Sequence, residues 1–332
     1  MQPKGIFCIS LDFELHWGVF DKQTADASRD YFLNTRKHID RMLTLFEQYK
    51  IRATWATVGA LNAKSQIELA EAIALIDAQY SESSYLPSML LENKVVGANE
   101  QDDPLHFANS IIEKIAGTKG QEIGTHTFSH FYTLEPGSTL SAFQRDLALS
   151  IKSLQSEGQE VKSLVFPRNQ YSDEHLEICA QEGIAVARIN PEDWFWQTEA
   201  QSKERLSKKV IRTLDHYFTL GKDTSFNLNE LEKKEGQPLL LPASRFFRPY
   251  SAIDKAFGKR KLQRILQEMS HAAKHNKVYH LWWHPHNFSV NPVQSFSDLE
   301  IILAHFQTLK GAYKMESHTM GEIADIYTEL NG

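Results

Sequence analysis

The chain has 332 residues, of which 42% are hydrophobic, so it can bury a sizeable core as two ordinary domains or as one α/β barrel. Its formal net charge of −6 gives no general basic surface, so we expect no nucleic-acid partner. Two cysteines, Cys8 and Cys179, are too few for a disulfide framework. The apolar run before Asp12 is too short for a signal peptide or a membrane span, and a cytoplasmic location is the expectation.

The first part of the chain predicts a strand–helix–strand unit. Residues 5–11 form a continuous apolar run, which is typical of a strand buried on both faces of a parallel sheet. An amphipathic helix over 31–48 and a second strand over 51–58 follow. Residues 62–119 are less regular, with helices expected around 67–78 and over 107–115. We interpret them as an insertion.

The remainder continues the alternation of strands and helices. The expected elements are a strand ending at Gly124, helix 139–157, strand 162–167, helix 173–182, strand 184–189, helix 203–218, strand 238–242, helix 256–275, strand 277–283, helix 297–309, and a last strand and helix within 314–327. This rhythm favours a parallel barrel or open sheet. We expect one catalytic domain over 1–332, with insertions near 62–119 and 217–250 that carry substrate selectivity.

Candidate chemistry lies where the predicted strands end. Asp12 and Glu14 follow the first strand, at the edge of an α/β sheet where ligands gather. His126 and His130 stand four residues apart in Thr125-His-Thr-Phe-Ser-His130. If the chain turns into a helical coil after Gly124, these two imidazoles lie on one face and can converge on one ion.

One carboxylate and two imidazoles make a ligand set suited to zinc, with open positions for water and substrate. The other acid is then free to act as a base. A hydrolase also needs a group that protonates the leaving group. Further strand-end candidates are Arg168, Asp193, Trp194, His284 and His286.

These residues resemble the motifs of the polysaccharide deacetylases, a carbohydrate esterase family that includes chitin-oligosaccharide and peptidoglycan deacetylases. Its first motif, usually Thr-Phe-Asp-Asp, is similar to Ser10-Leu-Asp-Phe-Glu14, with the two acids separated by one residue. The resemblance implies Asp12 as general base and Glu14 as metal ligand. The second motif, His-x-x-x-His, implies His126 and His130 as the other ligands.

The third family motif is an Arg followed by Pro-Pro-Tyr-Gly. Phe166-Pro-Arg-Asn-Gln-Tyr-Ser172 keeps the Arg and the Tyr but lacks the two prolines. The resemblance implies that Arg168 holds the base or walls the site, and that a backbone amide near Tyr171 binds the oxyanion. Phe246-Phe-Arg-Pro-Tyr-Ser251 resembles the motif too, but chain order favours Arg168 over Arg248, which is then a substrate-loop residue or a surface turn.

The fourth and fifth motifs resemble segments further along the chain. Asp193-Trp194 matches an Asp-Trp pair in which the Asp tunes a histidine and the Trp forms a groove wall; Trp17 is a further substrate-contact candidate. Tyr279-His-Leu-Trp-Trp-His-Pro-His-Asn287 supplies the general acid. The end of that strand favours His284, with His286 as the alternative and His280 as a packing residue.

The resemblance implies a distorted (β/α)7 barrel, a TIM-like α/β fold, with a divalent metal, zinc before others, at the carboxyl ends of the strands. It implies removal of N-acetyl groups from an amino-sugar-containing glycan or oligosaccharide. In the mechanism that the resemblance implies, Asp12 would take a proton from the attacking water, His284 would protonate the departing amine, and a bound metal together with a backbone N–H would supply stabilisation of the oxyanion.

Three alternatives stay open. Relatives of this family hydrolyse other C–N bonds, such as those of allantoin. A non-catalytic protein of this fold could bind sugars by stacking, with Trp17, Trp194, Trp196, Trp282 and Trp283 as candidates. A structural zinc site is the third, although such a site has four protein ligands and no spare acid. The sequence predicts no transmembrane segment and leaves the oligomeric state open.

Overall fold

One parallel sheet organises the chain. The computed structural model describes residues 4–155, 160–191, 196, 206–215, 217, 223–251 and 253–331. Within these residues the strand order is β6-β5-β4-β3-β2-β1-β8-β7, and β9 also pairs with β1. The strands are β1 (Ile6–Phe13), β2 (Ala53–Thr57), β3 (Gln121–Thr125), β4 (Ser163–Val165), β5 (Val186–Ile189), β6 (Leu239–Pro242), β7 (Arg245–Phe246), β8 (Val278–Trp283) and β9 (Glu316–His318). Every pair of these strands is parallel.

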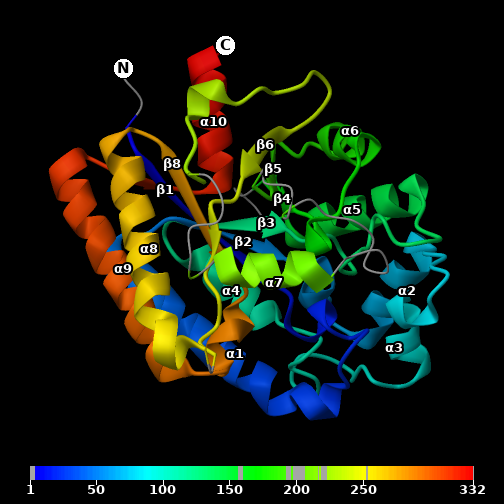
Figure 1. The fold of residues 1–332 in the computed structure, drawn as a ribbon. Helices are drawn as coiled ribbons and strands as arrows, with labels where there is room; N and C mark the ends of the chain where they lie inside the picture. Colours follow the sequence, from blue (N-terminus) through cyan, green and yellow to red (C-terminus); the bar gives the residue numbers. More distant parts are fainter. Residues whose placement is uncertain are drawn as a thin grey trace.

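Helices surround this sheet. They are α1 (Ala25–Tyr49), α2 (Gln66–Ile76), α3 (Ser88–Glu92), α4 (Asn109–Gly117), α5 (Leu140–Leu154), α6 (Asp173–Gln181), α7 (Leu206–Asp215), α8 (Asp254–Lys274), α9 (Pro292–Tyr313) and α10 (Met320–Asn331). Figure 1 shows α8 and α9 side by side along β8, with α2 and α3 on the opposite flank. Among the described residues, none of the helices has the length and apolar character needed to cross a bilayer.

The two ends of the strand order meet at a two-residue link. β6 and β7 lie at opposite ends of that order, yet only Ala243 and Ser244 separate them in the chain. The Ala243 N–H donates to Ile189 O of β5, and the Ser244 N–H donates to His280 O of β8, both at 2.8 Å. The sheet therefore curls into a distorted barrel, as predicted.

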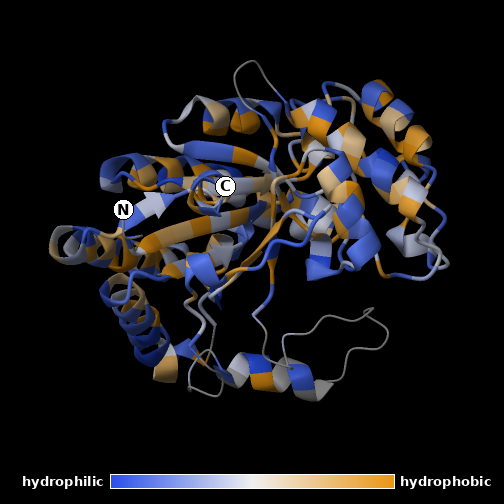
Figure 2. Cartoon of the chain, turned by 90° about the horizontal axis from the view of Figure 1, so that it is seen from above, coloured by the Kyte–Doolittle hydropathy of each residue, from blue (hydrophilic) through white to orange (hydrophobic). Residues whose placement is uncertain are grey.

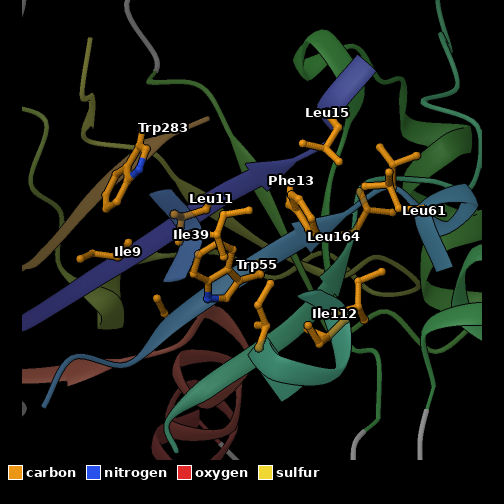
Figure 3. Close-up of a cluster of buried hydrophobic side chains, with 14 of the residues drawn as sticks. Ile9, Leu11, Phe13, Leu15, Ile39, Trp55, Leu61, Ile112, Leu164 and Trp283 are labelled. Carbon is orange, nitrogen blue, oxygen red and sulfur yellow. The ribbon is translucent and has the colours of Figure 1, made fainter. Parts of the chain in front are cut away.

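The main core lies between the outer face of the sheet and the helices. Ile9, Leu11 and Phe13 of β1 point to this side and are fully buried. Figure 3 shows them gathered with side chains such as Trp55 of β2 and Ile112 of α4. Figure 2 shows hydrophobic colours along the central strands and a mixture of hydrophobic and hydrophilic colours on the surrounding helices. Burial of these apolar side chains is the main favourable contribution to folding.

A second cluster fills the barrel at the amino ends of the strands. Cys8, Val186 and Val278 point inward from three strands and pack against Met320 and Ile323 of α10. In Figure 1, α10 lies at the same end of the barrel as the N-terminus. Because α10 closes this end, the opposite end, where the strands finish, is the one left for ligands.

Most predicted elements are present, with shifted ends. α1 begins six residues earlier than predicted, at Ala25, because the Thr24 side chain accepts a hydrogen bond from Ala27 N and caps it. α9 begins five residues early because Asn291 caps it, with Pro292 in its first turn. The two-residue strand β7 was not predicted, since so short a segment carries no periodicity.

Candidate active site

Polar side chains face the barrel interior between the apolar cluster that packs against α10 and the carboxyl ends of the strands. Along β1, Ser10 and Asp12 alternate with the core residues Ile9, Leu11 and Phe13, as the two-residue period of a strand requires. Both contact Arg188 of β5, although three strands separate β5 from β1 in the sheet. The contact therefore crosses the barrel interior.

Asp12 is held by both arms of the Arg188 guanidinium. Nη1 lies 2.7 Å from Oδ1 and Nη2 lies 2.8 Å from Oδ2, and both side chains are buried. Burial alone would raise the pKa of Asp12, but the charge of Arg188, followed by His284 and His126, lowers it below its usual value. Asp12 is thus an oriented, ionised carboxylate.

A series of hydrogen bonds through Ser10 and His280 supports Arg188. Nη1 of Arg188 donates to Ser10 Oγ at 3.0 Å, and Ser10 Oγ lies 2.8 Å from His280 Nε2. His280 Nδ1 lies 3.2 Å from Pro242 O, which can only accept, so Nδ1 carries the proton and Nε2 accepts from Ser10. Burial lowers the pKa of His280 to about 3 and keeps it neutral. His280 is therefore a supporting residue in the barrel wall, as its predicted packing role implies.

Glu14, His126 and His130 form the cluster that can hold a metal. Glu14 Oε2 lies 3.3 Å from His126 Nε2 and 3.2 Å from His130 Nε2. All three side chains are buried, and their ligand atoms lie within 4.8 Å of one another. The structure therefore brings together the three ligands that the family resemblance implies.

A turn, and not the helical coil that the spacing suggested, brings His126 and His130 together. Thr127 and His130 both have left-handed backbones, with φ of 63° and 59°. Asp146 of α5 holds the turn: its carboxylate accepts from Phe128 N at 2.6 Å and from Ser129 N at 3.0 Å. The helical coil that was the condition for this spacing does not form, because these local hydrogen bonds, which spacing does not reveal, set the backbone.

The two imidazoles are prepared to ligate a cation. His126 Nδ1 donates to Val165 O at 2.7 Å, so the Nε2 lone pair faces Glu14. Burial lowers the pKa of His130 to about 4, which keeps its ring neutral at physiological pH, the form that binds metals. The donor set, with the tautomer of His126 fixed in this way, fits a zinc-type ion.

His284 and His286 follow β8 and approach the carboxylates from the other side. His284 Nε2 lies 3.6 Å from Asp12 Oδ2 and 3.7 Å from Glu14 Oε1, and a quarter of its side chain is exposed. His286 is buried, stacks on His284 with ring centroids 4.9 Å apart, and places Nδ1 3.9 Å from Glu14 Oε1. Of the two, His284 has the greater access to a substrate.

A pocket of about 450 Å³ opens over these groups. Its lining includes Asp12, Glu14, His126, His130, Arg168, Arg248, Trp282, His284, His286 and Asn287. Among the described residues, none from 62–119 lines it, whereas Arg248 and Pro249 do. The second predicted insertion therefore reaches the site directly, and the first does not.

Arg168 walls the pocket but does not hold Asp12. Its Nη2 donates to Asp21 at 2.6 Å, its Nη1 lies 3.6 Å from Glu135, and its guanidinium stacks on the Tyr132 ring at 3.8 Å. Of the two roles implied for Arg168, its place in the pocket lining agrees with the wall, and Arg188 is the arginine that contacts Asp12. A lone arginine inside the apolar strand 184–189 was the signal that could have identified Arg188.

Four other predicted site residues either differ from expectation or lie outside the described part of the chain. Trp17 is fully buried and donates from Nε1 to His106 O at 3.1 Å, so its predicted substrate contact does not fit this position. Tyr171 is half-buried against Phe166 and is not among the described residues that line the pocket. Asp193 and Trp194 lie outside the described residues.

Fold and site together define an α/β barrel protein with a carboxylate–imidazole cluster at the carboxyl ends of its strands. The profile of the polysaccharide deacetylase family matches residues 19–187, so the chain belongs to that family. Among curated proteins, none matches this chain in sequence.

Solved structures share the fold at low sequence identity. A polysaccharide deacetylase assigned in Mycobacterium smegmatis has 12% identity and a TM-score of 0.62, over 99% of this chain and 92% of that one. A protein assigned likewise from Pseudomonas aeruginosa PAO1 has 11% identity and a TM-score of 0.54, over 97% and 90%. Puue allantoinase has 10% identity and a TM-score of 0.52, over the same shares. These likenesses support the barrel fold alone.

Proposed function

We propose that the chain is a single-domain, metal-dependent hydrolase that removes N-acetyl groups from an amino-sugar-containing glycan or oligosaccharide. The observation that supports this most is the meeting of three potential metal ligands with a separate, ionised carboxylate and a partly exposed imidazole. A structural metal site needs neither of the last two groups.

Glu14, His126 and His130 would hold the metal, and zinc suits this donor set. When bound, such an ion supplies a Lewis acid that lowers the pKa of water and polarises a carbonyl. The buried Glu14 carboxylate would balance part of the charge of such an ion, and the hydrogen bond from His126 to Val165 O fixes the orientation of one proposed ligand.

Asp12 would act as the general base. Arg188 keeps its carboxylate ionised and fixes both oxygens, which leaves it able to accept a proton from water on the pocket side. His284 would act as the general acid that protonates the departing amine, because it lines the pocket and lies 3.6 Å from Asp12.

A purely sugar-binding role finds less support. It relied on stacking by tryptophans, but Trp17 and Trp283 are fully buried, and Trp282 is the tryptophan among the described residues that lines the pocket. A binding protein also has no use for a base and an acid placed beside a ligand cluster.

The test is metal content together with acetate release from N-acetylglucosamine oligomers. We expect about one ion per chain in the wild type, loss of the ion and of acetate release in His126→Ala, and no change in His271→Ala, whose exposed imidazole pairs with Asp223. Metal without acetate release would favour another C–N substrate. Absence of metal from all three proteins would refute the proposal.

A further inference from the structure

The rim of the active-site pocket carries positive charge, whereas its acids lie at the floor. Arg168 and Arg248 both line the pocket, and Asp12 and Glu14 lie beneath them, buried and engaged by Arg188 and the histidines. The charge of Arg168 is balanced by Asp21 and Glu135. Among the described residues, no carboxylate forms an ion pair with Arg248, and no hydrogen bond uses its guanidinium.

The backbone that carries Arg248 is held on both sides. Before it, the Phe247 N–H donates to Trp282 O of β8 at 2.8 Å. At the residue itself, Lys261 Nζ of α8 donates to Arg248 O at 3.3 Å. Beyond it, Ser251 N and Oγ donate to Asp254 at 2.7 and 2.8 Å. The backbone position of Arg248 is therefore fixed before any ligand arrives.

Lys261 and Asp254 form a buried ion pair, with Nζ and Oδ1 2.9 Å apart and both side chains almost completely covered. Such a pair gains little net stability, because desolvation offsets much of the attraction. Here both partners also contact the turn over 248–251, so the pair fixes this turn. A prepared cation that has no counter-ion among the described residues, placed beside a hydrolytic centre, is the arrangement expected for recognition of an anion.

We infer that Arg248 binds an anionic group of the substrate, a phosphate or a carboxylate attached to the acylated sugar. This inference rests on the proposed function and adds to it that the preferred substrate is an acidic amino sugar. The planar guanidinium presents two parallel N–H donors, which match two oxygens of either group. Because Arg248 lies at the rim and touches none of the proposed ligands, its contribution falls on binding and not on the chemical step.

Three probe compounds distinguish recognition of the anionic group from recognition of the sugar: N-acetylglucosamine, N-acetylglucosamine 1-phosphate and N-acetylmuramic acid. Acetate release and equilibrium binding by calorimetry are measured for the wild type, Arg248→Gln and Arg248→Lys. The control is Arg41→Gln, which removes an equal charge from the exposed pair with Glu300. We expect Arg248→Gln to raise KM for the favoured acidic probe by about tenfold or more, the effect of one lost charge-assisted hydrogen bond, with kcat unchanged. Arg248→Lys should recover part of the loss.

KM for the neutral sugar should be the same in all variants. The acidic probe whose KM rises most in Arg248→Gln shows whether the bound group is a phosphate or a carboxylate. An equal rise in KM for neutral and acidic probes, or no rise for any probe, would overturn the inference. If no probe releases acetate, calorimetry still decides: tighter binding of an acidic probe than of N-acetylglucosamine, abolished in Arg248→Gln, supports the anion site while the proposed hydrolysis fails. Equal binding of all probes to the wild type overturns the inference itself.

Discussion

The two guanidinium nitrogens of Arg188 lie 2.7 and 2.8 Å from the two carboxylate oxygens of Asp12, across the interior of the barrel. The same guanidinium lies 4.1 Å from the centroid of the Trp282 ring, which covers it. This arrangement fixes the plane of the proposed base, and Ser10 and His280 fix Arg188 in turn. The orientation of Asp12 is thus determined by residues on three strands.

Arg188→Gln tests this relationship. We expect loss of activity by about 10²–10⁴-fold, the usual contribution of a positioned general base. Without the guanidinium, burial raises the pKa of Asp12, so the acid limb of the pH–rate profile should move to higher pH. The measurement is kcat/KM across pH, with Arg168→Gln for comparison. An unchanged acid limb in Arg188→Gln would contradict the assignment.

The stability of the same variant gives a second prediction. Removing Arg188 leaves a buried, unpaired carboxylate, which should cost about 3–5 kcal/mol of unfolding free energy. The double variant Asp12→Asn/Arg188→Gln has no buried charge at either position and should recover most of this loss while remaining inactive. Urea unfolding of the single and double variants measures it. Equal unfolding free energies of Arg188→Gln and the double variant would show that the unpaired Asp12 carboxylate is not the cause of the lost stability.

The assignment of Arg188 also shows what the sequence could reveal. Strand periodicity identified the barrel, and the order of strand ends brought together Asp12, Glu14, His126, His130 and His284, because parallel strands finish at one edge. Which arginine holds Asp12, the proposed base, depended on a contact between strands that are not neighbours. Motif spacing pointed to Arg168, whose side chain turns to Asp21 instead.

Local backbone geometry was the other feature that could not be predicted from the sequence. The i, i+4 spacing of His126 and His130 is compatible with a helix, yet Asp146 of α5 selects a left-handed turn. Trp17 follows the same strand end as Glu14, a place suited to a substrate contact, but its ring fits the core and its Nε1 donates to a carbonyl there. Side-chain direction after a strand end is set by packing, which no periodicity records.

Asp146→Asn tests the support of that turn. The carboxylate of Asp146 accepts from Phe128 N, Ser129 N and Ser129 Oγ, and an amide has a single acceptor oxygen. We expect metal affinity to fall about 10–100-fold, as for other residues that orient ligands. Competition with a chelator measures it. Asp40→Asn, which alters an exposed pair with Lys114, is the control and should bind metal normally. Unchanged affinity in Asp146→Asn would show that the turn holds without this carboxylate.

His284→Gln separates the two histidines after β8. Because His284 is the more exposed and lies nearer Asp12, its loss should lower kcat by about 10²–10⁴-fold with metal content unchanged. His286→Gln should lower kcat less, since this ring is more buried than His284 and its Nδ1 lies 3.9 Å from Glu14 Oε1. Single-turnover acetate release and elemental analysis measure the two effects. A larger kcat loss in His286→Gln would reverse the assignment.

Glu322, at the closed end of the barrel, should make stability depend on pH. Its carboxylate accepts from Thr319 N at 3.0 Å and Arg52 Nε at 2.6 Å, and lies 3.4 Å from His318 Nδ1. Burial opposes ionisation, but His318 and Arg52 lower the pKa of Glu322 from 4.5 to about 2. Its stabilisation is therefore present above pH 4.5 and is lost as the pH falls toward 2.

His318 determines how the stabilisation by Glu322 changes at higher pH. Burial opposes its charge, but Glu322 and Glu316 raise the pKa of His318 above 6.5, so its contribution is complete below that pH and is lost as the pH rises through the raised value. The difference in unfolding free energy between wild type and Glu322→Gln should therefore be largest between pH 4.5 and 6.5, at about 1–2 kcal/mol. Urea unfolding from pH 8 to pH 3 measures it, with the exposed Glu300→Gln as control. A difference that stays constant over this range would mean that Glu322 acts through packing and not through its charge.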